Sequence, residues 1–383
     1  MALKPEVLRS LAASIPEQCP QAIALKGVRR CGKSILQAQL MRRHASICYC
    51  NLEDTRLFGL SPEDFPAVLA VIDELSPATG PVFLDEVQEV NEWQRLVRTL
   101  LDRGRTVCVT GSNASLLGRE LGSKLTGRHR SFEVFPFNYR EYLAFTAQAP
   151  GESSLLAYLD DGGFPGYLRE RMPQVLQELL RDIVQRDIAQ RQALRETRHV
   201  MNLALFLLAN TGQPLSLQNL TKSLAIPAVA QTSRYVEYLL DAYLLLAVPR
   251  FSTSFKQRVV APNKYYAIDN GLRRVNSPAF TRDRGHRLEN VVALALRRQG
   301  GRLAYTGEKN LWECDFVTDT QAIQVCAELT PENRSRELLG AVQASRLPGR
   351  REAIILTLNQ RDNLHEAGVE VKVRPVWEWL TEN

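Results

Sequence analysis

The chain has 383 residues, of which 45% are hydrophobic and 23% are charged, and these values are ordinary for a soluble globular protein with two or three domains. The net charge of +6 permits an acidic partner such as nucleic acid but does not establish one, because basic and acidic residues are spread along the chain. A membrane-spanning protein is excluded, because the most apolar segments, residues 201–209 and 238–248, are too short to cross a bilayer. Seven cysteines without a C-x-x-C pair indicate reduced thiols, so we expect a cytoplasmic protein with no membrane partner.

Residues 27–34 read Gly-Val-Arg-Arg-Cys-Gly-Lys-Ser and match the phosphate-loop pattern G-x-x-x-x-G-K-[S/T] completely. The apolar run at 22–25 favours a buried strand before the loop, and residues 34–40 favour a helix after it. This order places a phosphate at the positive end of the helix dipole. Lys33 would reach the β- and γ-phosphates and the Ser34 hydroxyl would hold Mg²⁺, unless the match arose by chance in a loop rich in Gly and Lys. The residues that we expect around the nucleotide, ATP, are Gly27, Val28, Arg29, Arg30, Cys31, Gly32, Lys33, Ser34 and Ile35.

A second apolar run, residues 81–84, ends in Asp85 and Glu86 about fifty residues after the phosphate loop. We expect Asp85 to support Mg²⁺ through its water ligands and Glu86 to activate the attacking water, as a pair of acids does in many nucleotide-hydrolysing enzymes. Without the phosphate loop, the same run would indicate only the end of a strand that meets solvent.

A third apolar run, residues 106–110, is followed by Gly111, Ser112 and Asn113. A polar side chain at this strand end suits a sensor of the γ-phosphate or of the attacking water, and both Ser112 and Asn113 qualify. The alternative is that one of them caps the helix expected to begin near Ala114.

Six short segments then occur in a characteristic order along the chain. They are the phosphate loop, Asn-Leu-Glu-Asp at 51–54, Leu-Asp-Glu-Val-Gln at 84–88, Thr-Gly-Ser-Asn at 110–113, Leu-Thr-Gly-Arg at 125–128 and Phe-Pro-Phe at 135–137. In this order they resemble the AAA-like P-loop ATPase domain of a widespread prokaryotic family of predicted ATP-binding proteins. The resemblance implies an α/β fold with a parallel sheet, ATP and Mg²⁺ as cofactors, and ATP hydrolysis.

The resemblance also implies a role for Arg128 as an arginine finger or sensor at the γ-phosphate. A guanidinium suits the charge that develops on that phosphate during transfer. A surface arginine in a basic loop is the alternative reading of Gly-Arg-His-Arg at 127–130.

Residues 151–255 predict a helical linker followed by a winged helix-turn-helix. Gly-Gly-Phe-Pro-Gly at 162–166 marks a break that also resembles the family, and Leu and Ile residues between 176 and 188 recur near the helical period. Between 199 and 250 a helix, a short helix and a longer helix follow one another, with Gln231, Thr232, Ser233 and Arg234 as exposed positions of the last. This module could bind DNA, but its charges are nearly balanced, and a role as a scaffold is the alternative.

Residues 256–383 resemble the restriction-endonuclease-like second domain of the same family. The resemblance rests on Glu289 in a helix, Asp315 in a strand, and a further strand with two inward polar positions. Such nucleases hold Mg²⁺ with Asp and Glu, and a Lys two residues after the Glu activates water. Here Gln324 stands where the acid is expected and Cys326 where the lysine is expected, so we expect a catalytically degenerate domain.

Together these features predict an α/β protein with an ATPase domain over 1–150, a helical and winged-helix domain over 151–255, and a nuclease-like domain over 256–383. We expect an Mg²⁺-dependent ATPase that acts as a molecular switch or motor on DNA, through self-association, or on a protein client. Two alternatives stay open: an ATP-gated, metal-dependent nuclease, and an ATP-dependent protein-interaction switch that contacts no nucleic acid.

Overall fold

The structure is a computed structural model that describes residues 7–76, 80–111, 125, 127–252, 254, 261–277, 284–308, 310–349 and 351–382. The chain divides into two compact units according to its internal contacts. The first unit runs to Pro136 and includes Asp241–Tyr243, and the second comprises the rest of the chain from Phe137. Residues 137–150, which we assigned to the first domain, therefore lie in the second unit.

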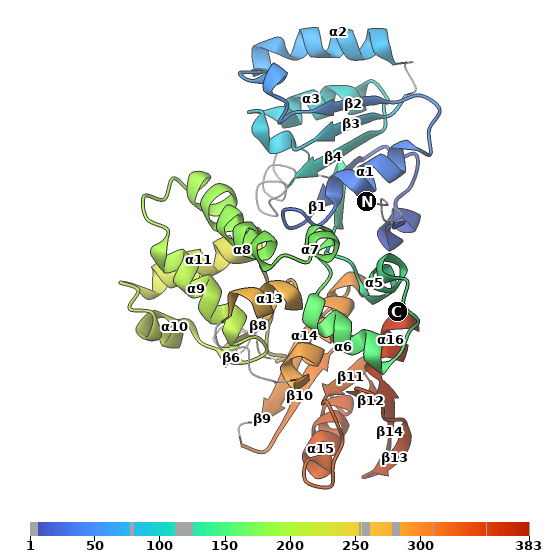
Figure 1. The fold of residues 1–383 in the computed structure, drawn as a ribbon, viewed down its shortest axis with the longest axis vertical. Helices are drawn as coiled ribbons and strands as arrows, with labels where there is room; N and C mark the ends of the chain where they lie inside the picture. Colours follow the sequence, from blue (N-terminus) through green and yellow to red (C-terminus); the bar gives the residue numbers. More distant parts are fainter. Residues whose placement is uncertain are drawn as a thin grey trace. The chain divides into compact units, whose positions relative to one another are not determined.

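The first unit is built on a five-stranded parallel sheet of order β2-β3-β4-β1-β5 (Figure 1). Strands β1, β3 and β4 are short apolar runs that are buried throughout, as is typical of a parallel sheet covered by helices. Because all five strands run the same way, the ends of β1 and β3 lie at one edge of the sheet, where open α/β sheets bind their ligands. The strands are β1 (Ala22–Lys26), β2 (Cys48–Asn51), β3 (Val82–Asp85), β4 (Val107–Gly111) and β5 (His129–Glu133).

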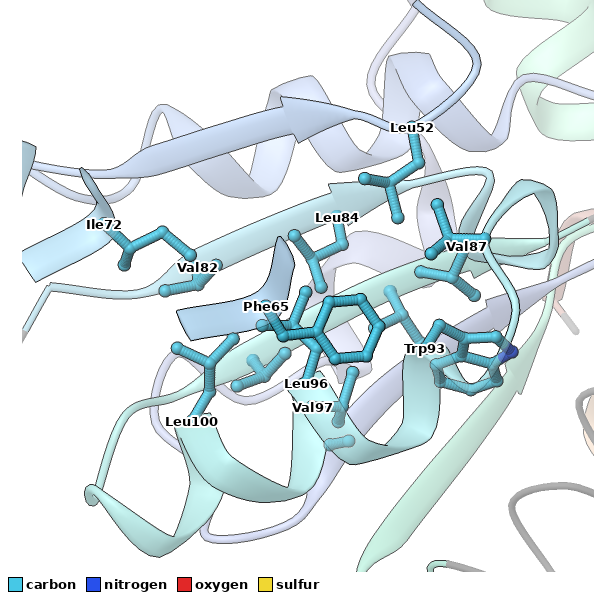
Figure 2. Packing of buried hydrophobic residues seen from close by; sticks show 14 of the residues in the cluster. Leu52, Phe65, Ile72, Val82, Leu84, Val87, Trp93, Leu96, Val97 and Leu100 are labelled. Carbon is cyan, nitrogen blue, oxygen red and sulfur yellow. The ribbon is translucent and has the colours of Figure 1, made fainter. Parts of the chain in front are cut away.

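Helices α2 (Phe65–Leu75) and α3 (Trp93–Asp102) contribute to the core of the first unit. Residues Trp93, Leu96, Val97 and Leu100 of α3 follow the spacing of one helix face, and all are buried. Figure 2 shows these side chains with Phe65 and with strand residues such as Leu84. Helix α1 (Lys33–Met41) contacts β3 and β4, and short 3₁₀ turns cover Ser10–Ser14, Thr55–Leu57, Pro62–Asp64 and Val87–Glu89.

The second unit begins with helices and a small antiparallel sheet of order β6-β8-β7. Strand β8 lies beyond residue 255, where we expected a domain boundary, and pairs with two strands that precede that residue. Thr232, which we expected to be exposed on α11, is fully buried, and its hydroxyl lies 2.7 Å from the Thr221 hydroxyl of α10. The elements are α5 (Tyr139–Thr146), α6 (Glu152–Asp161), α7 (Pro165–Glu170), α8 (Pro173–Asp182), a π-helix (Ile183–Gln190), α9 (Arg198–Ala209), β6 (Pro214–Leu215), α10 (Leu217–Ser223), α11 (Val229–Asp241), β7 (Leu245–Val248) and β8 (Asn263–Ala267).

A six-stranded mixed sheet of order β13-β14-β12-β11-β10-β9 completes the second unit. Strands β10 and β11 are antiparallel, whereas β11 and β12 are parallel and are joined through α15. The elements are α13 (Asn270–Asn276), α14 (Arg284–Gln299), β9 (Ala304–Glu308), β10 (Trp312–Val317), β11 (Gln321–Val325), α15 (Arg334–Ser345), β12 (Glu352–Thr357), β13 (Asp362–Glu366), β14 (Val369–Pro375) and α16 (Val376–Glu382).

None of the helices in the described part of the chain has the length and apolar character needed to cross a membrane. All seven cysteines lie within the described residues, and each is a free thiol.

Candidate nucleotide site

The phosphate loop connects the end of β1 to the start of α1, as the sequence predicts. Gly32 is the residue before the helix and has φ of 101°, in the left-handed region that favours glycine. Because Gly32 has no side chain to cap the helix, the first-turn N–H groups of α1 are suited to bind an anion. Gly27 is required for a different reason, since a Cβ atom there would lie 2.0 Å from the backbone oxygen of Val134.

Lys33 is buried within this loop although it is a charged residue. Its Nζ donates to the backbone oxygens of Gly27 at 3.0 Å and Val28 at 3.2 Å, so the ammonium is held by the loop itself. By contrast Ser34, which would hold the metal, is exposed at the start of α1. The other residues that we expected around the nucleotide differ in exposure: Val28 and Cys31 are buried, Arg29 is half-buried, and Arg30 and Ile35 are exposed.

Cys31 has a structural position in the loop. Its thiol is fully buried and donates to the backbone oxygen of Val134 at 3.2 Å. Burial raises the pKa of this thiol, so it stays protonated and unreactive at neutral pH.

Arg9 is a loop contact that the sequence did not predict. Its buried guanidinium donates to the backbone oxygen of Cys31 at 2.8 Å and to that of Phe135 at 2.6 Å. The backbone N–H of Arg9 donates to Gln39 of α1 at 3.0 Å. Arg9 thus joins the phosphate loop to the segment after β5. Its two partners, Cys31 and Phe135, are 22 and 126 residues away along the chain, so no local pattern in the sequence indicates these contacts.

Asp85 is the last residue of β3 and is buried. The Thr110 hydroxyl on β4 donates to one carboxylate oxygen of Asp85, and the Tyr49 hydroxyl on β2 donates to the other at 3.2 Å. Burial and the negative charge of Asp85 raise the pKa of Tyr49 to about 12, so its phenol remains a donor at neutral pH. Neither Thr110 nor Tyr49 was singled out from the sequence, because their roles depend on how β2, β3 and β4 pair.

Glu86 follows Asp85 directly and has a φ of 52°, which is uncommon for a residue other than glycine. Its backbone N–H donates to the Thr110 hydroxyl at 2.9 Å, and its carboxylate accepts from Gln88 Nε2. One threonine therefore positions both acids that we expected at this strand end.

The structure does not bring Arg128 to this site within one chain. Arg128 precedes β5, and its backbone oxygen accepts from Ala22 N at 2.8 Å, at the start of β1. The phosphate loop follows the other end of β1, about 13 Å away for a strand of this length. The Arg128 guanidinium is half-exposed and pairs with Asp102 at 2.5 Å. Asn113 and its alternative, Ser112, lie outside the described residues.

Comparisons with known proteins agree with this geometry. Residues 20–143 match a family described as an AAA domain, and residues 152–283 match a domain of unknown function, DUF8612. The uncharacterized protein MJ1544 of Methanocaldococcus jannaschii is 30% identical over 393 aligned positions, which cover 92% of this chain and 86% of the relative. The chain belongs to the family of MJ1544. An uncharacterized protein of Haemophilus influenzae is also 30% identical, over 81% of this chain and 83% of the relative.

Two solved structures show a weaker similarity to this MJ1544-family protein. The Walker-type ATPase PABY2304 of Pyrococcus abyssi has a TM-score of 0.43 at 17% identity, over 67% of this chain and 90% of that chain. The ORC1 protein of Aeropyrum pernix, solved in complex with DNA, has a TM-score of 0.32 at 13% identity, over 70% of this chain and 88% of that chain.

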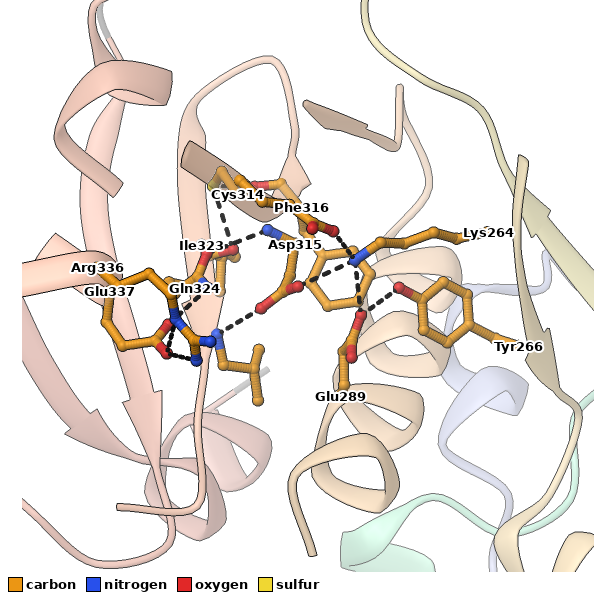
Figure 3. Close-up of polar contacts among 12 residues, drawn as sticks. Lys264, Tyr266, Glu289, Cys314, Asp315, Phe316, Ile323, Gln324, Arg336 and Glu337 are labelled. Atoms are coloured by element: carbon orange, nitrogen blue, oxygen red, sulfur yellow. Dashed lines mark hydrogen bonds and ion pairs between the residues drawn. The ribbon is translucent and has the colours of Figure 1, made fainter. Parts of the chain in front are cut away.

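In the second unit, the two residues that depart from the nuclease pattern are engaged elsewhere. Gln324 on β11 donates to Glu337 of α15 at 2.6 Å, and its oxygen accepts from the backbone N–H of Asp315 at 3.2 Å (Figure 3). Cys326 packs in a hydrophobic cluster with residues such as Leu338, and burial raises the pKa of its thiol to about 12. Neither side chain supplies the charge that a carboxylate or a lysine would bring.

Proposed function

We propose that the first unit binds ATP with Mg²⁺ and hydrolyses it. The observation that carries this proposal is the joint placement, at one edge of the parallel sheet, of a glycine-capped helix start with a buried lysine and a buried strand-end aspartate. The residues present suit this ligand, because an ammonium and backbone N–H groups bind phosphate, and hydroxyl and carboxylate oxygens are the ligands that Mg²⁺ prefers.

In this proposal each residue has a separate task. Lys33 and the first-turn amides of α1 hold the phosphates, while Ser34 and Asp85 hold Mg²⁺, the latter through water. Glu86 accepts the proton of the attacking water. Mg²⁺, when bound, neutralises charge on the β- and γ-phosphates.

Two substitutions separate binding from hydrolysis. Lys33→Ala removes the cation at the phosphates and is expected to abolish measurable ATP binding in a fluorescent-nucleotide titration. Glu86→Gln keeps the size of the side chain but cannot accept a proton, so ATP binding should persist while turnover falls by about 100-fold or more, the range of general-base contributions. Hydrolysis that continues undiminished in Glu86→Gln would contradict the role of this carboxylate.

We further propose that ATP drives a switch in which the second unit contacts the partner. The order α9, β6, α10, α11, β7, β8, with β8 paired between β6 and β7, supports a winged helix-turn-helix between residues 198 and 267. On and near its longer helix, Lys222 and Arg234 are balanced by Glu237 and Asp241. A DNA-binding surface is usually basic, so this charge balance favours a protein client over DNA.

A further inference from the structure

Lys264 is a buried lysine at the carboxylates that the nuclease pattern assigns to metal binding. It lies on β8, and its Nζ is 3.0 Å from Asp315 Oδ1 on β10 and 3.2 Å from Glu289 Oε1 on α14. A third carboxylate oxygen, from Glu313, lies at 2.7 Å. Figure 3 shows the ammonium between the Glu289 and Asp315 carboxylates.

The surroundings of this ammonium are those of a bound cation. An ammonium has three N–H donors, and three carboxylate groups lie within hydrogen-bonding distance of Lys264. The nitrogen also lies 5.5 Å from the centre of the Tyr305 ring. Three carboxylate oxygens around one nitrogen favour the charged form of Lys264 over the neutral amine.

The two carboxylates are held in place by further bonds. The Tyr266 hydroxyl donates to Glu289 Oε1 at 2.6 Å, and the backbone N–H of Val325 donates to the second oxygen of Asp315 at 3.0 Å. Lys264, Glu289 and Asp315 therefore belong to a connected, buried network, to which the exposed Glu313 adds a third carboxylate.

These residues do not fit the divalent metal that the nuclease resemblance implies. The two expected carboxylate ligands both contact the Lys264 ammonium, and the third position is Gln324, an amide bonded to Glu337. Within the described residues, no group of three or more His, Cys, Asp or Glu side chains is arranged to hold a metal ion. These carboxylates are not closed off from ions, since Lys264, Glu289 and Asp315 line a cavity of about 1180 Å³.

We propose that Lys264 is a built-in counter-ion that takes the place of a divalent cation between Glu289 and Asp315. The ammonium then balances part of the negative charge of the pair from within the chain, and this cavity is not a metallonuclease centre. A metal could bind these two carboxylates only in competition with the ammonium, whose N–H groups already occupy Glu289 Oε1 and Asp315 Oδ1.

Mn²⁺ binding to the full-length, nucleotide-free protein tests the proposal, with electron paramagnetic resonance counting the bound ions. Wild type and Asp315→Asn are expected to bind the same amount of Mn²⁺. Lys264→Met removes the charge but keeps an unbranched stem, and it should gain one Mn²⁺ site that Lys264→Met/Asp315→Asn lacks. Lys372→Met is the matched control, since Lys372 pairs with Glu352 at 2.7 Å on the surface of the same unit, and it should gain no site.

Two results would overturn the proposal: a Mn²⁺ site in wild type that Asp315→Asn removes, or a folded Lys264→Met protein without a gained site. Thermal unfolding gives a second measurement, because Lys264→Met leaves buried carboxylates without their cation. Mn²⁺ should then raise the melting temperature of Lys264→Met but not that of wild type. If Lys264→Met does not fold even with Mn²⁺, the comparison of wild type with Asp315→Asn decides, since it needs no change at Lys264.

Discussion

At the scale of single residues, the Thr110 hydroxyl links the two acids at the end of β3. It donates to the Asp85 carboxylate and accepts from the backbone N–H of Glu86. All of its surface is buried, so water cannot replace it without rearrangement. A single side chain therefore fixes the residue expected to support the metal and the residue expected to activate water.

Thr110→Val keeps the shape of this side chain and removes its hydrogen bonds. We expect a loss of about 1–3 kcal/mol in the free energy of unfolding, because a carboxylate oxygen and an N–H group lose a buried partner. The rate of ATP hydrolysis should fall by roughly tenfold to 100-fold with a smaller change in ATP affinity, since the acids are displaced rather than removed. Chemical denaturation, steady-state kinetics and a nucleotide titration measure these three effects.

Thr99→Val is the matched control for this experiment. Thr99 is a half-buried threonine on α3 whose hydroxyl donates to a backbone oxygen of its own helix. Its loss should leave both stability and turnover nearly unchanged. Turnover as fast in Thr110→Val as in Thr99→Val would show that the hydroxyl does not position the acids.

Side chains whose roles depend on contacts between distant parts of the chain could not be identified from the sequence. Gly32 and Lys33 were predicted because their chemistry is encoded within eight consecutive residues. Thr110 was visible at a strand end, but nothing local indicated that it faces Asp85, 25 residues away in the sequence. Lys264 was not singled out from the sequence either, and its partner Asp315 is 51 residues away.

At the scale of elements, the segment before β1 is tied to both the phosphate loop and α1. Arg9 reaches the Cys31 and Phe135 backbone oxygens, whereas Arg43 of the α1 C-terminal region reaches backward to the oxygens of Ala12 at 2.8 Å and Ile15 at 3.1 Å. Both arginines anchor this segment, but only Arg9 contacts the loop. Substitutions of Arg9 and Arg43 can therefore distinguish two effects: anchoring of the N-terminal segment, and support of the phosphate loop.

Arg9→Met keeps much of the apolar stem and removes the guanidinium. We expect a loss of about 1–3 kcal/mol in the free energy of unfolding, because buried carbonyl oxygens lose a charged donor. ATP affinity should also fall, by roughly tenfold, since the loop loses its connection to the segment after β5. Chemical denaturation and a nucleotide titration provide the two readouts.

Arg43→Met supplies the comparison, since it should reduce stability and leave ATP affinity close to that of wild type. Equal ATP affinities in the two variants would show that Arg9 anchors only the N-terminal segment. The β1–loop–α1 element itself could be predicted because its apolar runs and glycines are adjacent in sequence. The contact of Arg9 with this loop could not be predicted, because it depends on how distant parts of the chain fold together.

At the scale of the whole molecule, the position of Arg128 bears on how subunits would cooperate. Within one chain it lies at the start of β5, at the opposite edge of the sheet from the phosphate loop, and it pairs with Asp102. An arginine on that edge can reach a phosphate only if it belongs to a neighbouring copy. The finger role implied by the family resemblance thus becomes a prediction about self-association.

If Arg128 acts on a neighbour's ATP, Arg128→Ala should lower turnover by about 1000-fold or more, the range seen when an arginine finger is lost, without reducing ATP affinity. Mixing it with Lys33→Ala should restore part of the activity, because the mixed assembly contains sites with an intact loop facing an intact arginine. Arg103→Ala is the matched control, since Arg103 is also half-exposed and paired with an aspartate, Asp73, in the same unit. Mass measurement with and without ATP must show assembly under the same conditions. Two results would contradict this role: turnover of Arg128→Ala equal to that of wild type, or no recovery of activity in mixtures that do assemble. Arg128 would then be a surface arginine, because a residue at that edge of the sheet has no other route to the phosphates.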